Sequence, residues 1–171
     1  MHFETHITAE PGQKTIVMER MFDAPRRLVF EALTKPEYLK RWWGGNCAKL
    51  VGCDIDLRVG GAYRFVSRVE GGDEYAFKGV YREIAPPGRL VYTQIFDVPP
   101  YNTEEYQAIV TTDLEERDNK TFVRVVIEHA SVEGRDQHVA TGMEVGVRQS
   151  HDALDDLLVE LRGPRAVEAR A

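Results

Sequence analysis

Histidine and cysteine are the residues of this 171-residue chain from which metal binding or nucleophilic catalysis would be built. His129, His138 and His151 are separated by nine and thirteen residues, so none of them forms the i, i+4 pair of a zinc-binding helix. Cys47 and Cys53 match no metal-ligand spacing, and no local motif marks a Ser or Cys nucleophile. The sequence therefore predicts no metal, no cofactor and no catalytic residue, and it leaves open whether the protein is an enzyme.

Aromatic residues on three predicted strands indicate a different chemistry, the binding of an apolar molecule. On the strands predicted at 62–69, 74–84 and 90–96, these residues lie on the face opposite Arg64, Lys78 and Arg82. Because charged side chains face water, we expect the following aromatic residues to face the interior: Tyr63, Phe65, Phe77, Tyr81 and Tyr92. They could be ordinary core, but buried tyrosine hydroxyls need partners, and several of them in one hollow would orient an amphipathic ligand.

A long helix must supply the opposite wall. Apolar positions recur every three or four residues from Val139 to Leu161, and Gly163 followed by Pro164 ends the pattern. Its C-terminal half is rich in leucine and is expected to anchor the helix. Its N-terminal half contains Gly142 and Gly146, which leave room, and we expect this half to form the cavity wall through Met143, Val147 and Ser150.

Trp42 and Trp43 complete the set of candidate ligand-binding residues. They end a short helix predicted from Pro36 to Trp42, and consecutive helical residues point about 100° apart. One indole can therefore fill the junction between helix and sheet while the other stacks on a ligand at the cavity mouth.

The order of elements predicts an α+β helix-grip fold. A strand at 15–22 precedes two short helices, further strands follow at 47–56, 62–69, 74–84, 90–96, 107–116 and 121–129, and the long helix comes last. Short turns between successive strands indicate an antiparallel sheet of about seven strands, which would curve around the single long helix. We expect a loose leader at 1–13, one domain at 14–163 and a tail at 164–171.

Composition narrows the class of partner. A net charge of −6 without a basic cluster argues against nucleic acid. No apolar run approaches the ~20 residues of a membrane span, and no secretion signal is visible, so we expect a cytoplasmic protein that has no membrane partner and keeps reduced cysteines. Acidic residues such as Asp155 and Asp156 are expected on the solvated surface, and a homodimer stays open.

Six segments of the chain resemble the START-like SRPBCC superfamily, in the branch of homologues of the activator of the heat-shock-protein-90 ATPase. They span most of the domain, in the family's order, with Pro86-Pro87, Leu154 and Leu158 as further matches: 20–25, 29–34, 42–44, 56–61, 79–84 and 142–147. The resemblance implies a helix-grip fold and a cavity for a lipid, polyketide or other apolar metabolite. Gly45 departs from the pattern, because many relatives carry Pro after Trp-Trp-Gly.

The sequence is compatible with three functional hypotheses. The favoured hypothesis is binding of a small, largely apolar ligand between the sheet and the N-terminal half of the long helix. The first alternative is a cyclase, aromatase or hydrolase that uses the same cavity. The second is a chaperone accessory that binds protein, which an apolar outer face of the sheet would favour; that face instead carries Arg64, Arg68 and Lys78.

Overall fold

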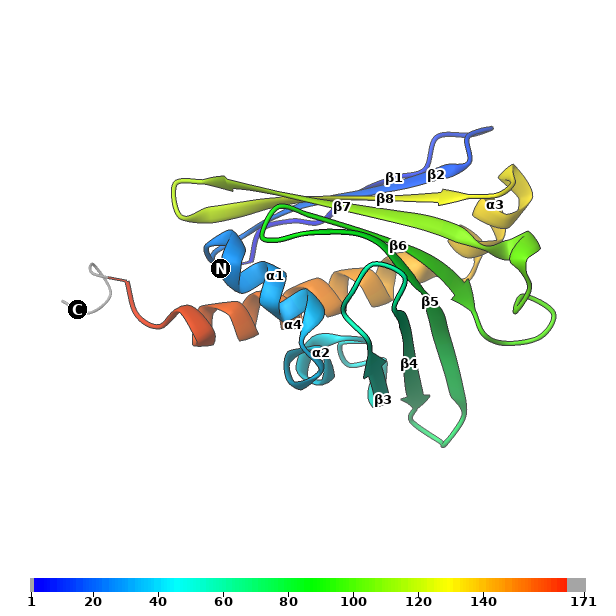
Figure 1. Ribbon diagram of the computed structural model, residues 1–171, viewed down its shortest axis with the longest axis horizontal. Helices are drawn as coiled ribbons and strands as arrows, with labels where there is room; N and C mark the ends of the chain where they lie inside the picture. Colours follow the sequence, from blue (N-terminus) through cyan, green and yellow to red (C-terminus); the bar gives the residue numbers. More distant parts are fainter. Residues whose placement is uncertain (1, 166–171) are drawn as a thin grey trace.

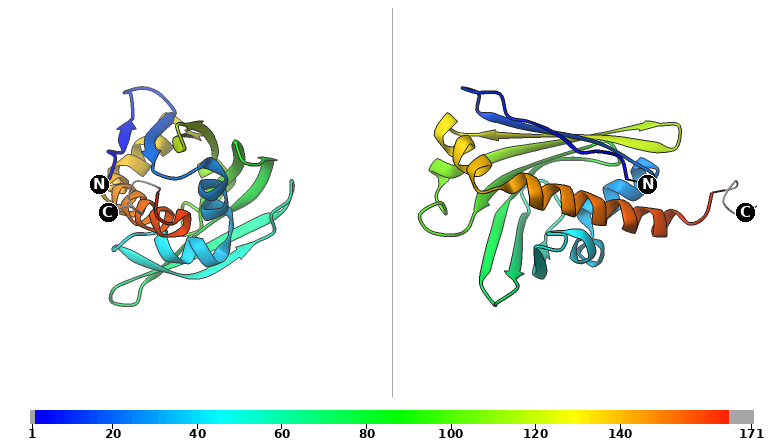
Figure 2. Two further views of the ribbon diagram at one scale, coloured as in Figure 1. Left: turned by 90° about the vertical axis from the view of Figure 1, so that its left-hand side faces the viewer. Right: turned by 180° about the vertical axis from the view of Figure 1, so that it is seen from behind.

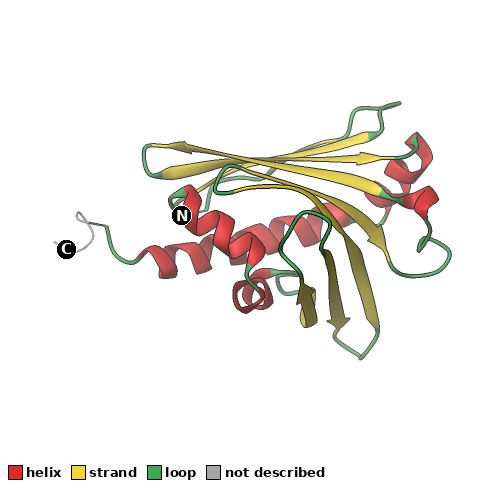
Figure 3. Ribbon diagram, in the orientation of Figure 1, coloured by secondary structure: helices red, strands yellow, loops and turns green. Residues whose placement is uncertain are grey.

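An eight-stranded antiparallel sheet dominates the computed structural model, which describes residues 2–165 (Figures 1 and 3). The strand order is β1-β2-β8-β7-β6-β5-β4-β3. The strands are β1 (His6–Thr8), β2 (Thr15–Phe22), β3 (Ala48–Ile55), β4 (Ala62–Val69), β5 (Glu74–Ala85), β6 (Arg89–Phe96), β7 (Ala108–Arg117) and β8 (Lys120–His129). The helices are α1 (Arg26–Thr34), α2 (Pro36–Trp42), α3 (Val132–Ala140) and α4 (Met143–Arg162), with a short 3-10 turn, η1 (Glu104–Tyr106).

The helix-grip class predicted from the sequence is confirmed. The left view of Figure 2 shows the sheet curving around α4, with α1 and α2 on the same side. The sheet has one strand more than expected, because His6–Thr8 pairs with β2 at the edge. No helix within residues 2–165 is long and apolar enough to cross a membrane.

Alternation along the strands decides which side chains face α4. In β2, Ile16, Met18, Arg20 and Phe22 are buried while the residues between them keep partial exposure. The hairpin between β7 and β8 turns at Asp118 and Asn119, whose φ angles are 53° and 62°. Asp and Asn tolerate this left-handed conformation, which matches the twist of a two-residue hairpin.

The long helix begins later than the periodicity predicts. Val139 belongs to a separate helix, α3, and α4 starts only at Met143. Gly142 separates the two helices because its φ of 78° places it in the left-handed region. Ser131 begins α3 by accepting a hydrogen bond from the Gly134 N–H at 3.0 Å. Gly142 is therefore a hinge between helices and no part of the wall.

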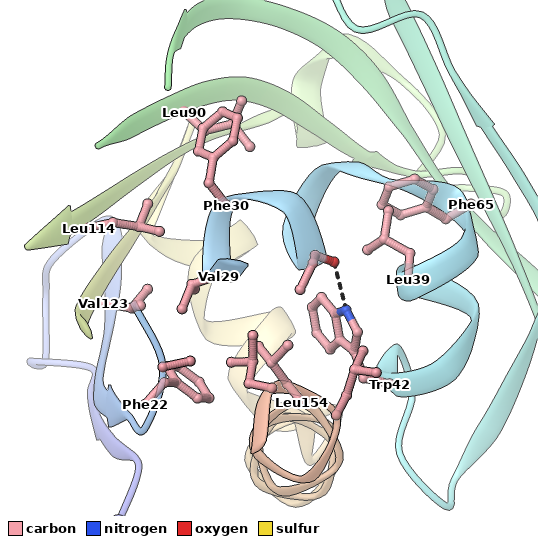
Figure 4. Close-up of a cluster of buried hydrophobic side chains, with 14 of the residues drawn as sticks. Phe22, Val29, Phe30, Leu39, Trp42, Phe65, Leu90, Leu114, Val123 and Leu154 are labelled. Atoms are coloured by element: carbon pink, nitrogen blue, oxygen red, sulfur yellow. Dashed lines mark hydrogen bonds between the residues drawn. The ribbon is translucent and has the colours of Figure 1, made fainter. Parts of the chain in front are cut away.

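The larger of the two buried hydrophobic clusters includes residues of α1, α2 and the C-terminal half of α4 (Figure 4). Leu154, Leu157 and Leu158 are at most 3% exposed. The Trp42 indole N–H donates to the Ala32 carbonyl at 2.9 Å, which joins α2 to α1. The leucine-rich half of α4 thus anchors the helix, as the sequence predicts.

Two smaller expectations are wrong. Asp155 is only 1% exposed, because it lies against Arg20 of β2 and accepts a hydrogen bond from the Asp23 N–H. Cys47 lies in the turn before β3 and not on the strand that contains Cys53. Both cysteines are free thiols.

Candidate functional site

A cavity of about 550 Å³ lies between the N-terminal half of α4 and the concave face of the sheet. Its walls come from β2, from β4 to β8 and from α1 to α4. In the right view of Figure 2 this half of α4 runs below the sheet toward α3. The volume falls within the range of about 300–1,000 Å³ that small-molecule sites occupy.

All ten candidate residues from the sequence border this one cavity. They come from three strands and two helical segments: Trp42, Trp43, Tyr63, Phe65, Phe77, Tyr81, Tyr92, Met143, Val147 and Ser150. Tyr63, Phe65 and Tyr81 are buried while Arg64 and Arg82 are exposed, so the predicted sheet faces are confirmed. That these residues contact a ligand stays a prediction.

The two tryptophans have different surroundings. Trp42 is 6% exposed and its indole N–H donates to the Ala32 carbonyl, so it is mainly a core residue. Trp43 is half-buried, and its ring packs edge-on against Phe65 at 5.0 Å and Phe77 at 6.2 Å between centroids. Trp43 is the tryptophan placed to contact a molecule in the cavity.

The turn after Trp43 is fastened directly to α4. The Gly44 N–H donates to Ser150 Oγ at 3.0 Å, so one acceptor site of the Ser150 hydroxyl is occupied. Gly45 adopts a φ of 55°, and a Cβ there would lie 2.7 Å from Gln149 Cβ. Proline cannot adopt this φ, so the departure from the family pattern coincides with a close approach of the turn to the helix.

Three tyrosines form a triangle on the sheet wall. The ring centroids of Tyr63, Tyr81 and Tyr92 lie 5.4–6.1 Å apart. Tyr63 reaches across β5 and donates its hydroxyl to the Thr93 carbonyl at 2.6 Å. Gly79 makes this possible, because a Cβ there would lie 2.8 Å from the Tyr63 ring and 1.8 Å from the Thr93 carbonyl oxygen.

The other two hydroxyls of the triangle lack a partner within residues 2–165. Among the described residues, neither the Tyr81 nor the Tyr92 hydroxyl has a hydrogen-bond partner. Burial raises the pKa of Tyr92 to about 12, and burial followed by the neighbouring Tyr92 and Cys53 raises the pKa of Tyr81 further. Both phenols are therefore protonated donors at neutral pH.

A histidine pair lies at the α3 end of the cavity, and sequence spacing gave no sign of it. His129 Nε2 and His138 Nδ1 are 3.0 Å apart, because α3 folds back over the end of β8. Burial, then His138 and Arg135, lowers the pKa of His129 to about 4, and burial lowers the pKa of His138. Two neutral imidazoles thus share one hydrogen.

His151 is a third cavity-lining histidine, on α4. Its Nδ1 lies 3.0 Å from Thr5 Oγ1, and its ring packs edge-on against Phe22. Burial, followed by Arg20, lowers its pKa to about 4. Within the described part of the chain, no three His, Cys, Asp or Glu residues are grouped to hold a metal ion.

Gly146 marks open space on the helix wall. It lines the cavity, and a Cβ built there would meet no atom within 4 Å. The expectation that small residues leave room between helix and sheet is met at this position.

Residues of the β6–β7 connection also border the cavity, although the sequence indicated only a loop there. Tyr101 stacks on Phe96 with 6.3 Å between centroids and packs edge-on against Tyr106 at 5.3 Å. The two tyrosines in this loop were the available signal, but strand periodicity does not extend to them. Both tyrosines are half-buried, and Phe96 packs in turn against Phe77.

Known proteins with a similar sequence or structure share this architecture. The sequence model of the family described as Activator of Hsp90 ATPase homolog 1-like protein matches residues 23–159. No curated protein matches the chain.

Several solved bacterial structures are similar. A protein from Rhodobacter sphaeroides is 24% identical, with a TM-score of 0.81 over 92% of this chain and 99% of its own. One from Chromobacterium violaceum is 28% identical, with a TM-score of 0.70 over 84% and 96%. An AHSA1-like protein from Aeromonas hydrophila is 17% identical, with a TM-score of 0.67 over 84% and 93%.

Proposed function

The chain belongs to the family of Activator of Hsp90 ATPase homolog 1-like proteins, and from this premise we propose that it binds a small, largely apolar ligand beneath α4. Folds of this START-like kind commonly bind hydrophobic ligands. The proposal extends that property to this chain, with a lipid, polyketide or aromatic metabolite as the ligand class.

The observation that carries the proposal is the cavity itself. Protein interiors are normally packed as densely as organic crystals, so an aromatic-lined space of about 550 Å³ departs from ordinary core packing. Moving apolar ligand surface into it contributes roughly 25 cal/mol per Å². Gly146 lies on the same wall, where an added Cβ would meet open space.

Native mass spectrometry of the protein purified from its own source tests the proposal. We expect a noncovalent complex with a small molecule, and the added mass should disappear on denaturation. The matched control is Gly146→Leu from the same source, in which the added side chain should exclude the molecule. Bare protein in both preparations, together with no uptake of an apolar fluorescent dye, would contradict the proposal.

A second candidate is an acid–base enzyme that acts on a ligand in the same cavity. The hydrogen-bonded pair of His129 and His138 favours it, because a neutral imidazole in an apolar site can accept and return a proton. Mass spectrometry separates this candidate from simple binding. If the pair is catalytic, His138→Gln should retain a molecule of different mass from the one that wild-type protein retains.

The protein-binding alternative has less support on this chain. Arg64 and Lys78 on the outer face pair with Asp97, and Arg68 pairs with Glu74. A face covered with such ion pairs is charged rather than apolar.

A further inference from the structure

The lining of the cavity carries no fixed charge. Among the described residues that border it, none is Asp, Glu, Lys or Arg. The three histidines that line it are held neutral by burial near pH 7. Transfer of a carboxylate or an ammonium group into such a space is costly unless an opposite charge meets it.

Two hydrogen-bond donors in the same lining, the hydroxyls of Tyr81 and Tyr92, have no acceptor among the described residues. Tyr81 is 3% exposed and Tyr92 is half-buried, and both side chains line the cavity. Tyr81 and Tyr92 are cross-strand partners on β5 and β6, which places the two rings side by side. Neither hydroxyl is among the fully enclosed polar atoms that lack a partner, so each can donate a hydrogen bond to a water or to a ligand oxygen that enters the cavity.

The third hydroxyl of the triangle shows what a satisfied tyrosine looks like here. Tyr63 donates to the Thr93 carbonyl at 2.6 Å, and Thr93 Oγ1 in turn accepts the Val80 N–H at 2.9 Å. Regular pairing of β5 with β6 is interrupted between the Lys78–Ile95 and Tyr81–Tyr92 pairs. There, the two bonds to Thr93 connect β6 to β4 and β5. Tyr63 therefore has a structural role, while Tyr81 and Tyr92 remain available.

We propose that the ligand is uncharged and carries a carbonyl or hydroxyl oxygen that accepts hydrogen bonds from Tyr81 and Tyr92. This inference rests on the proposed function and narrows it. It favours neutral oxygenated aromatic molecules, such as ketones and phenols, over fatty acids and other carboxylates.

Three naphthalene probes of similar size test the inference by isothermal titration at pH 7.5. They are 2-acetylnaphthalene, 2-ethylnaphthalene and 2-naphthoate. We expect 2-acetylnaphthalene to bind about three- to tenfold more tightly than 2-ethylnaphthalene, the effect of one or two neutral hydrogen bonds. We expect 2-naphthoate to bind more than about tenfold more weakly than the ketone.

Conservative variants test whether the Tyr81 and Tyr92 hydroxyls cause the preference for the ketone. The double variant Tyr81→Phe/Tyr92→Phe should bind 2-ethylnaphthalene at least as well as wild type but lose the preference for the ketone. Tyr63→Phe is the matched control, because it removes a hydroxyl that already has a partner; it should lower stability and keep the preference. Circular dichroism confirms that each variant is folded.

Two results would overturn the inference. Equal affinity for the ketone and the hydrocarbon would mean that water alone satisfies the two hydroxyls. Tight binding of 2-naphthoate would mean that the site tolerates charge. In both cases the proposed function stands, whereas failure of all three probes to bind would reject the proposed function as well.

Discussion

Arg20 Nη2 on β2 and Asp155 Oδ2 on α4 lie 3.6 Å apart, with both side chains almost completely buried. Arg20 also pairs with Asp152 at 2.8 Å and donates to Thr5 Oγ1 at 3.1 Å. Burial raises the pKa of Asp155, against the opposing effects of the Asp23 N–H and Arg20. The contact links the first long strand to the last helix across the buried interior.

Removing one partner of this buried pair should be costly. Asp155→Ala leaves the buried Arg20 guanidinium with Asp152 and the Thr5 hydroxyl as partners, and we expect a loss of about 3 kcal/mol in the free energy of unfolding. Asp156→Ala is the control, because that side chain is 74% exposed; it should change stability by less than about 0.5 kcal/mol. Urea denaturation measures both, and equal effects of the two variants would refute the structural role of Asp155.

Gly146→Leu should fill the cavity without destabilising the protein. The new side chain meets open space, and replacing Gly in a helix gains about 0.7–1 kcal/mol. Binding of an apolar dye should fall, while Val145→Leu on the exposed side of α4 should leave dye binding unchanged. A cost of ~1–3 kcal/mol with dye binding intact would instead indicate a close-packed core at this position.

Substitution of Trp42 should mainly lower stability, whereas substitution of Trp43 should mainly weaken ligand binding. Trp42→Phe loses the hydrogen bond to the Ala32 carbonyl and part of a buried ring, so we expect a loss of about 2–3 kcal/mol with little change in the affinity for dye. Trp43→Leu should instead weaken dye binding and cost less stability. Denaturation and dye titration on the same samples check this pair, and the reverse pattern would exchange the two roles.

Three half-buried histidines, His129, His138 and His151, should make stability depend on pH below neutrality. Their folded pKa values lie below the value of about 6.5 expected in the unfolded chain, and those of His129 and His151 fall to about 4. The unfolded state therefore binds more protons between about pH 6.5 and 4, so stability should fall as the pH drops through this window.

Urea midpoints between pH 7.5 and 5 measure this effect. The double variant His129→Gln/His138→Gln should show a shallower dependence than wild type. Identical slopes for the two proteins would mean that the histidine pair is as easily protonated in the folded state as in the unfolded one.

The sequence was most informative where periodicity and tertiary packing agree. Alternation placed Tyr63, Phe65 and Tyr81 on the correct face, and the leucines of α4 marked its anchored half. Periodicity could not locate the break at Gly142, because the apolar repeat continues across it. It also placed Asp155 in water, since a second packing surface on a helix depends on which strand lies beside it.

The polar parts of the site depended on tertiary structure. His129 and His138 are nine residues apart in the chain and come together only because α3 folds over the end of β8. The sequence likewise could not show that Tyr63 is satisfied while Tyr81 and Tyr92 are not. That difference depends on the Thr93 carbonyl, which accepts the Tyr63 hydroxyl beside Gly79, where the regular pairing of β5 with β6 is interrupted.

The methionine methyl groups offer the most direct test of binding beneath α4. Met18 and Met143 line the cavity from the sheet and the helix, whereas Met21 alternates onto the other face of β2. In protein labelled with ¹³C-methyl methionine, we titrate 2-acetylnaphthalene and follow the methyl signals by NMR. We expect saturable shifts of the Met18 and Met143 signals at one probe per chain, with the Met21 signal unchanged. Unchanged Met18 and Met143 signals at saturating probe, or a shift confined to Met21, would contradict a ligand site between α4 and the sheet.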